Sequence, residues 1–141
     1  MKKLIIAVIL LGCLACAFAQ DCSVTVEVSG VEPKAGTVYL AVFNSESSYK
    51  KKETFQTRKA DADGTILEIP LVLPAGDYVI VVFQDLNMNV KLDANFIGIP
   101  KEPVGISNYD GKSIPGGFSK LKMTVSASTK TIPIKLISIK T

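Results

Sequence analysis

The chain has 141 residues, with 16 basic and 13 acidic side chains, and it contains neither histidine nor tryptophan. This length fits one domain that can bury a proper core without disulfide bonds. The near balance of charge excludes the concentrated basic surface on which nucleic-acid binding depends, and the lack of histidine removes the most common general base from any enzyme.

The first 19 residues have the features of a secretory signal peptide. Lys2 and Lys3 precede an apolar run, and small residues at Ala17 and Ala19 occupy the positions that a signal peptidase reads. The run is too short, and too close to this point, for a membrane span. We therefore expect cleavage before Gln20, export to the periplasm or the extracellular space, and a single domain over residues 20–141 with no transmembrane span.

A lipoprotein is the alternative interpretation of this region. Leu10-Leu11-Gly12-Cys13 resembles a lipobox, which would leave a lipid-anchored Cys13 at the N-terminus. Without Lys2 and Lys3, 14 basic residues face 13 acidic ones and the net charge is +1. Soluble export leaves Cys22 as a single thiol without a partner, and we interpret it as an inert residue at the edge of the core.

Apolar and polar residues alternate through the first part of the domain, which predicts half-buried β-strands. Residues 22–29 and 36–43 show this pattern and are expected to pair as an antiparallel hairpin. Residues 44–53 break it, and Ser45 followed by Ser48 is a weak capping signal for one turn of helix at most. The inward positions of the two strands are Val24, Val26, Val28, Val38, Leu40 and Val42.

The chain from residue 54 to residue 83 continues in the same way. A short edge strand is expected near residues 54–59, followed by a hairpin turn at Asp63-Gly64, because glycine takes the positive φ that such turns require. Pro70 indicates that the next strand, residues 64–74, lies at a sheet edge or carries a bulge. Residues 78–83 are apolar on both faces, so we expect a central strand that is covered on both sides.

Two further strands complete the domain. Their inward positions are Leu121, Met123 and Val125 in the first, and Ile132, Ile134 and Leu136 in the second. About seven short strands with no long helical period predict an all-β fold, an antiparallel Ig-like or prealbumin-like β-sandwich. Residues 85–117 have neither period, and an irregular loop of this length is often functional; a short strand hidden near residues 96–99 is the alternative.

The start of this loop has the spacing of a calcium-binding loop. Asp85, Asn87 and Asn89 occupy alternate positions, Lys91 offers a main-chain carbonyl, and Asp93 follows. Ca²⁺ prefers such oxygen ligands, with glycine at position six and glutamate at position twelve. Here those two positions hold Val90 and Phe96, which disfavours tight binding. The alternative is a metal-free connection in which Asp and Asn side chains bond nearby amides and stabilise turns.

The second half of the loop combines prolines and glycines with apolar residues. We interpret Phe96, Ile97, Ile99, Val104 and Ile106 as a cap on one end of the sandwich. The alternative is a rigid rim around a ligand groove. The polar contacts of that groove would be Glu102, Ser107, Asn108 and Tyr109.

Three segments resemble a known family. They are LAVFNSESSYKK from Leu40, LPAGDYVIVVFQDLNMNVKLDANFIGIPKEPVGISN from Leu73, and Gly117-Phe118. Across essentially the whole mature chain the protein resembles DUF2141, a family of exported bacterial domains of unknown function. The resemblance implies a β-sandwich similar to transthyretin-like and carboxypeptidase-regulatory domains. The family motif usually has histidine where this chain has Gln84 and glycine where it has Val90, so any role that needs that histidine is absent.

These features predict a non-catalytic, exported envelope module with a binding or structural accessory role. Residues 85–117 would contact an envelope protein or a small ligand, with weak Ca²⁺ binding as a further candidate. One alternative is a carrier of a small ligand or carbohydrate with a pocket at residues 85–117. The other is a hydrolase that uses a carboxylate pair such as Asp85 with Asp93 or Glu102. No spacing brings those carboxylates to a defined separation, so we expect no enzymatic activity.

Overall fold

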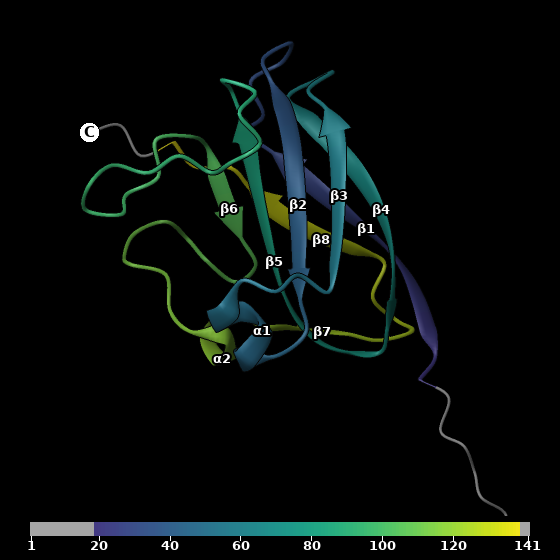
Figure 1. Ribbon diagram of the computed structural model, residues 1–141. Coiled ribbons are helices and arrows are strands. Elements are labelled where there is room, and N and C mark those ends of the chain that lie inside the picture. Colours follow the sequence, from purple (N-terminus) through teal and green to yellow (C-terminus); the bar gives the residue numbers. More distant parts are fainter. Residues whose placement is uncertain (1–18, 139–141) are drawn as a thin grey trace, which may run out of the picture.

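Two β-sheets pack face to face in the computed structural model, which describes residues 19–138 (Figure 1). The first sheet has the order β4-β1-β8, and the second has the order β3-β2-β5-β6, with β7 also pairing with β5. Pairing is antiparallel except between β1 and β8, which run parallel. The predicted β-sandwich is therefore confirmed. The signal segment and Cys13 lie outside the described residues.

Eight strands and two short helices make up the described part of the chain. The strands are β1 Asp21–Ser29, β2 Thr37–Phe43, β3 Gln56–Asp61, β4 Ile66–Pro74, β5 Gly76–Asp85, β6 Val104–Ile106, β7 Met123–Val125 and β8 Thr131–Lys135; the helices are α1 Glu46–Lys51 and α2 Phe118–Leu121. Among the described residues, no helix has the length and apolar character needed to cross a bilayer.

The period-two pattern of the sequence places the core between the sheets. Val24, Val38, Ile80 and Ile134 come from four different strands, and each is at most 3% exposed. Met123 is half-buried against the same cluster. β5 is central, between β2 and β6, and is buried on both faces as predicted. Cys22 is also buried at the edge of this core.

Two predicted hairpins are wrong. β1 and β2 belong to different sheets, and so do β3 and β4 on either side of Asp63-Gly64. Gly64 does not have the positive φ expected of it. Alternation shows which side chains point inward, but two strands that face each other across a core show the same alternation as two strands that pair.

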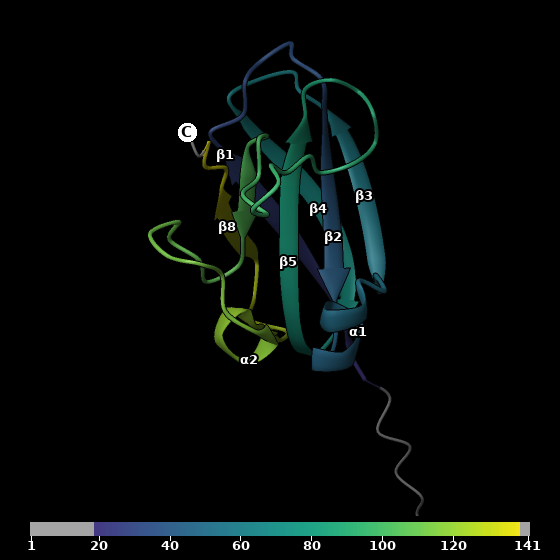
Figure 2. The ribbon, with the colours of Figure 1, turned by 60° about the vertical axis from the view of Figure 1, so that its left-hand side comes forward.

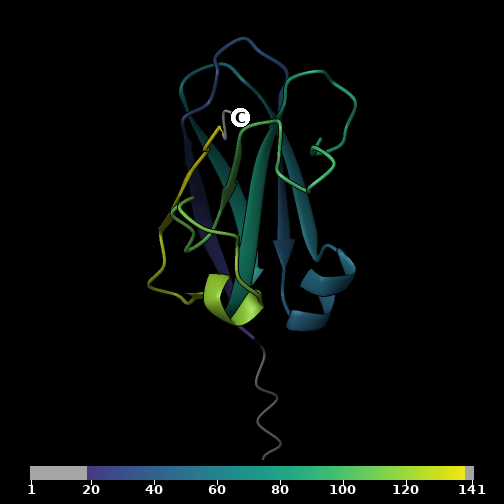
Figure 3. The ribbon, with the colours of Figure 1, turned by 90° about the vertical axis from the view of Figure 1, so that its left-hand side faces the viewer.

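The helices cover the outer face of the second sheet at one end. α1 begins with a complete capping box, in which Ser45 and Ser48 bond each other's main-chain N–H groups. α2 ends at Leu121, which was expected in a strand but lies in the helix, where it is buried with Phe118, Phe43 and Val79. Figure 3 shows both helices at the end of the sandwich opposite the loop that follows β5.

The segment between β5 and β6 crosses the other end of the sandwich (Figure 2). The short strand that was the alternative near residues 96–99 is not formed; the strand in this segment is β6, Val104–Ile106, and only an isolated bridge joins Ala94 to Pro100. Pro100 lacks the N–H that a longer ladder would need. β1 begins at the helical end, so the loop points away from the N-terminal end of the described chain (Figure 1).

Candidate functional site

The long loop starts from two buried polar residues at the end of β5. Gln84 is fully buried, and its side-chain oxygen accepts from the N–H of Glu32 at 2.9 Å. Its amide nitrogen donates to the carbonyls of Glu32 (2.7 Å) and Ala35 (2.6 Å). The residue at the position of the family's histidine therefore ties the β1–β2 connection to the base of the loop.

Asp85 fixes the first turn of the loop. Its side chain is fully buried, and its two oxygens accept from the N–H groups of Asn89 (3.2 Å) and Val90 (2.7 Å). Hydrogen bonds from main-chain amides to an ionised carboxylate are stronger than those between neutral groups. The carboxylate of Asp85 thus supplies hydrogen-bond acceptors for main-chain N–H groups that have no neighbouring strand after the end of β5.

Glu102 joins the two halves of the loop. It is 5% exposed, and its oxygens accept from the N–H groups of Leu86 (3.0 Å) and Asp93 (3.1 Å). Residues 86 and 93 are therefore held together by a side chain that enters from the far end of the segment. Glu102 was predicted as a ligand contact, and in the structure its carboxylate is turned towards the backbone.

Asn87, Asn89 and Asp93 converge at the surface of the loop. The side-chain amides of Asn87 (2.5 Å) and Asn89 (2.9 Å) both donate to the same oxygen of Asp93. These two hydrogen bonds hold the pKa of the Asp93 carboxyl below its usual value. Three of the five predicted metal ligands therefore meet at one point.

The same asparagines also form the turns that a metal-free loop requires. The side-chain oxygen of Asn87 accepts from the N–H of Asn89 (3.1 Å), and that of Asn89 accepts from the N–H of Lys91 (2.9 Å). These bonds to the residue two positions later are Asx turns. The turn interpretation of the spacing thus has a structural counterpart, in which the side-chain oxygens of Asn87 and Asn89 face main-chain N–H groups and their nitrogens face Asp93.

Val90 adopts the conformation that glycine takes at position six of a calcium loop. Its φ is 62°, and Met88 has a φ of 58°. Positive φ is costly for a β-branched residue, and here two hydrogen bonds to Asp85 surround it. Two observations do not fit a metal site. The oxygens of Asp85 are directed at main-chain amides, and among residues 19–138 no three carboxylate, histidine or cysteine side chains cluster in a way that could hold a metal ion.

The loop exposes large apolar side chains. Of the ten large hydrophobic residues that are exposed in the described part of the chain, seven lie between residues 85 and 117. Phe96 is fully exposed, and Ile97 is 63% exposed. The prediction that these two residues cap the sandwich is wrong, whereas Val104 is buried in β6. The side-chain oxygen of Asn95 accepts from the N–H groups of Ile97 and Ile99. The turn that these bonds form leaves the side chains of Phe96 and Ile97 in solvent.

The other predicted contact residues divide into buried and accessible ones. Ser107 is buried, and its hydroxyl accepts from the N–H of Ile80 and donates to the carbonyl of Leu121. Asn108 is exposed and donates to the carbonyl of Lys122, and the hydroxyl of Tyr109 donates to the carbonyl of Ser113.

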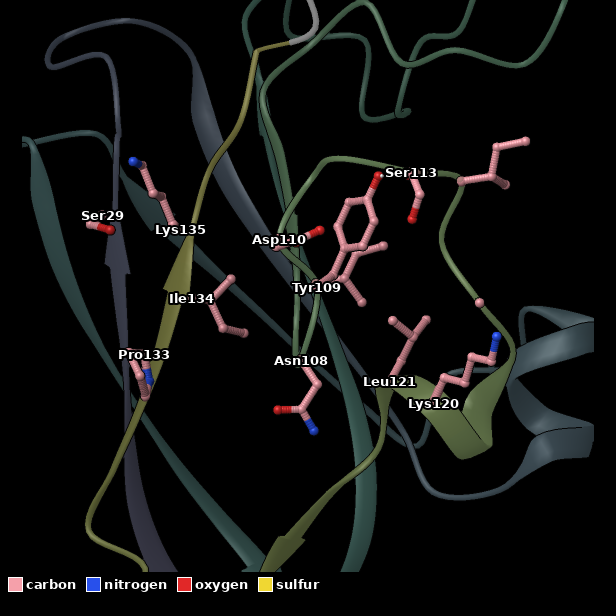
Figure 4. Close-up of a pocket in the computed structure, with 13 residues that line it drawn as sticks. Ser29, Asn108, Tyr109, Asp110, Ser113, Lys120, Leu121, Pro133, Ile134 and Lys135 are labelled. Atoms are coloured by element: carbon pink, nitrogen blue, oxygen red, sulfur yellow. Dashed lines mark hydrogen bonds between the residues drawn. The ribbon is translucent and has the colours of Figure 1, made fainter.

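Asn108 and Tyr109 line a groove of about 680 Å³ on the side of the sandwich (Figure 4). Glu102 and Ser107 are not part of its lining. The groove also takes residues from α2 and β8, which the sequence did not suggest. Lys120, Pro133 and Lys135 stand at outward positions of short elements. Nothing in the sequence around them except the residue types themselves could have indicated a groove.

The fold and the loop define a class of protein, a β-sandwich with a hydrogen-bonded, Asx-rich loop at one end. The family model described as an uncharacterized protein conserved in bacteria, DUF2141, matches residues 26–133. The chain belongs to this family, as the resemblance of its sequence predicted. Searches of curated proteins and of solved structures gave no match.

Proposed function

We propose that the protein is a non-catalytic binding module of the bacterial envelope, which contacts its partner through residues 85–117. The observation that carries this proposal is the group of exposed apolar side chains on a loop that hydrogen bonds hold in place. Contiguous exposed apolar surface marks interaction sites in soluble proteins. A loop that is fixed before binding loses less conformational entropy when it binds.

The hydrogen bonds of the loop support a binding role over a catalytic one. The carboxylates of Asp85 and Glu102 are buried and each accepts two main-chain N–H groups. A carboxylate in this arrangement is directed at the backbone, whereas a general acid or a nucleophile must face its substrate. Asp93 is bound by two asparagine amides.

The direction of the loop is compatible with both export routes, cleavage before Gln20 and lipid anchoring at Cys13. β1 starts at the end of the sandwich opposite the loop, so a partner at residues 86–97 would lie away from the start of β1 (Figure 1). Mass spectrometry of the N-terminus tests the export route. A chain that starts at Gln20 supports soluble export, an acylated Cys13 supports the lipoprotein, and an intact Met1 in the native host contradicts both.

Photo-crosslinking in the native host tests the contact role. Phe96 is replaced by a photo-crosslinking analogue of phenylalanine, and the matched control carries the same analogue at Val72, which is 51% exposed on the outer face of β4. We expect one discrete adduct from position 96 and none from position 72. Equal labelling at both positions, or none at position 96, would contradict the proposal.

Calcium binding by the loop is a second candidate function. The glycine-like φ of Val90 and the meeting of the Asn87, Asn89 and Asp93 side chains support it, and Ca²⁺ would require both asparagine amides to turn their oxygens towards Asp93. A ligand that binds the native state alone raises the melting temperature, so the test is thermal unfolding of EDTA-treated protein with and without millimolar Ca²⁺. A rise that Asp93→Asn abolishes supports the candidate. An unchanged midpoint, or an equal rise in Asp93→Asn, leaves the asparagines as turn formers.

A further inference from the structure

The groove of Figure 4 lies where the two sheets separate. At one end the sheets are joined, since Val104 and Ile137 exchange two main-chain hydrogen bonds of 3.1 and 2.9 Å. Gly105 permits this approach, because a Cβ there would lie 2.5 Å from the carbonyl oxygen of Lys135. Towards Pro133 the sheets are no longer bonded, and the gap is lined from both sides by Ile134 and Tyr109.

The groove has an apolar floor and an apolar rim. Leu121 and Ile134 are each 2% exposed and form its floor, and Ile134 points into it from β8 (Figure 4). Ile114, on the connection between β6 and α2, is 91% exposed at the rim. A molecule that lies in the groove would remove this side chain from water, which is favourable in proportion to the area covered.

The charge of the groove is positive. Lys120 and Lys135 lie on opposite sides of it, with the ammonium of Lys135 turned away from Tyr109 and Leu121 (Figure 4), and neither lysine forms a salt bridge with another residue of the described chain. The one carboxylate in the lining, Asp110, is engaged by Lys112, through its main-chain N–H at 3.1 Å and its ammonium at 3.9 Å. An anionic group in the groove would therefore meet an available cation at Lys120.

Lys120 is the better placed of the two lysines. Its aliphatic stem lies over Gly116, where a Cβ would be 2.8 Å from the Cδ atom of Lys120. Lysine stems commonly pack on the surface while the ammonium stays in water. The packing therefore holds the side chain of Lys120 at the rim of the groove, which Ile114 also lines.

We propose that this groove binds an amphipathic small molecule with one anionic group. The apolar body lies on Leu121, Ile134 and Ile114, and the anionic group pairs with Lys120, with Lys135 adding to the positive field. The groove shares residues 106–116 with the contact segment proposed above, but it does not include the exposed apolar residues 86–97. A failure of decanoate binding in the groove is therefore distinguishable from a failure of crosslinking at Phe96.

A titration with decanoate, observed by two-dimensional ¹⁵N–¹H NMR of the purified protein, tests the site. We expect saturable shifts at Asn108, Tyr109, Ser113 and Lys120, and none at Met88 or Phe96. Decyltrimethylammonium, which has the same chain and the opposite charge, is the matched probe and should bind more weakly. Equal binding of the two probes, shifts that do not saturate, or shifts confined to residues 86–97 would overturn the proposal.

Two variants at exposed positions separate the charge from the apolar contact. Lys120→Gln should raise the half-saturating decanoate concentration about two- to five-fold, the usual range for an exposed ion pair. Ile114→Ala should raise it about threefold or more, because part of a covered side chain is removed. Ile97→Ala is the control on the neighbouring loop and should leave decanoate binding unchanged. If both groove variants bind decanoate as the unmodified protein does, the site is refuted even though both remain folded.

Discussion

The sandwich core and the loop after β5 are built by different forces. The core is held by valine, isoleucine and leucine side chains that alternate inward from two sheets. The loop has the reverse distribution, since its carboxylates Asp85 and Glu102 are buried while Met88 and Phe96 are exposed. Burial of apolar area stabilises the first region, and charge-assisted hydrogen bonds to the backbone stabilise the second. The loop therefore leaves these apolar side chains exposed to solvent.

The sharpest test of this comparison removes an apolar side chain from each region. Ile80→Ala should lower the free energy of unfolding by about 2–5 kcal/mol, because it leaves a cavity in a fully buried site. Phe96→Ala removes a larger side chain but should change the free energy of unfolding by less than about 0.5 kcal/mol, because Phe96 is fully exposed. Urea unfolding of both variants measures this. Equal losses would show that Phe96 packs against the sandwich in solution.

The junction between the two regions depends on Gly36. Its φ is 61°, and a Cβ there would lie 1.9 Å from the carbonyl oxygen of Asp85. Gly36→Ala should therefore destabilise the protein by about 2 kcal/mol or more, since neither the backbone conformation nor the backbone oxygen can accommodate the methyl group. Gly64→Ala is the control, because its φ is not positive and a Cβ there would meet its nearest neighbour at 3.6 Å. Similar melting temperatures for the two variants would contradict the close approach of the β1–β2 connection to the loop.

Removal of the hydrogen bonds by which Glu102 joins the two halves of the loop should have an intermediate effect on the free energy of unfolding. Glu102→Gln leaves one acceptor oxygen for two N–H groups and turns its own NH₂ towards one of them, which should cost about 1–3 kcal/mol. Amide hydrogen exchange at Leu86 and Asp93 should accelerate more than exchange in β2. Glu68→Gln, at an exposed position of β4, should leave both measurements unchanged. Slow exchange at both amides in Glu102→Gln would show that the loop is held by other contacts.

The core could be predicted from the sequence, while the pairing of its strands could not. Inward positions such as Val24 and Ile134 follow from period-two alternation, which depends only on each strand's own residues. Whether β1 pairs with β2 or faces it depends on distant partners, and both arrangements give the same pattern. In the loop, the spacing of Asp85, Asn87 and Asn89 predicted a tight turn. The bridging role of Glu102 and the exposure of Phe96 could not be predicted, because both depend on where the far end of the segment returns.

The smallest effect is expected at the opposite end of β5, where a carboxylate is exposed. Asp77 accepts from the ammonium of Lys122 (2.6 Å) and the hydroxyl of Thr124 (2.7 Å). These bonds hold the pKa of the Asp77 carboxyl below its ordinary value of 3.8. Because the pKa is lower in the folded state, the stabilisation is present above the unfolded value and is lost as the pH falls through the folded pKa.

Asp77→Asn should therefore lower the melting temperature slightly at neutral pH, and the difference from the unmodified protein should vanish in acid. Lys122→Met should remove most of that pH dependence, because Thr124 then remains as the single donor to Asp77. Thermal unfolding between neutral and strongly acid pH measures both variants. A melting-temperature difference that persists unchanged in acid would mean that Asp77 contributes through packing rather than through its charge. Asp77 would then resemble the buried residues of the core more than the carboxylates of the loop.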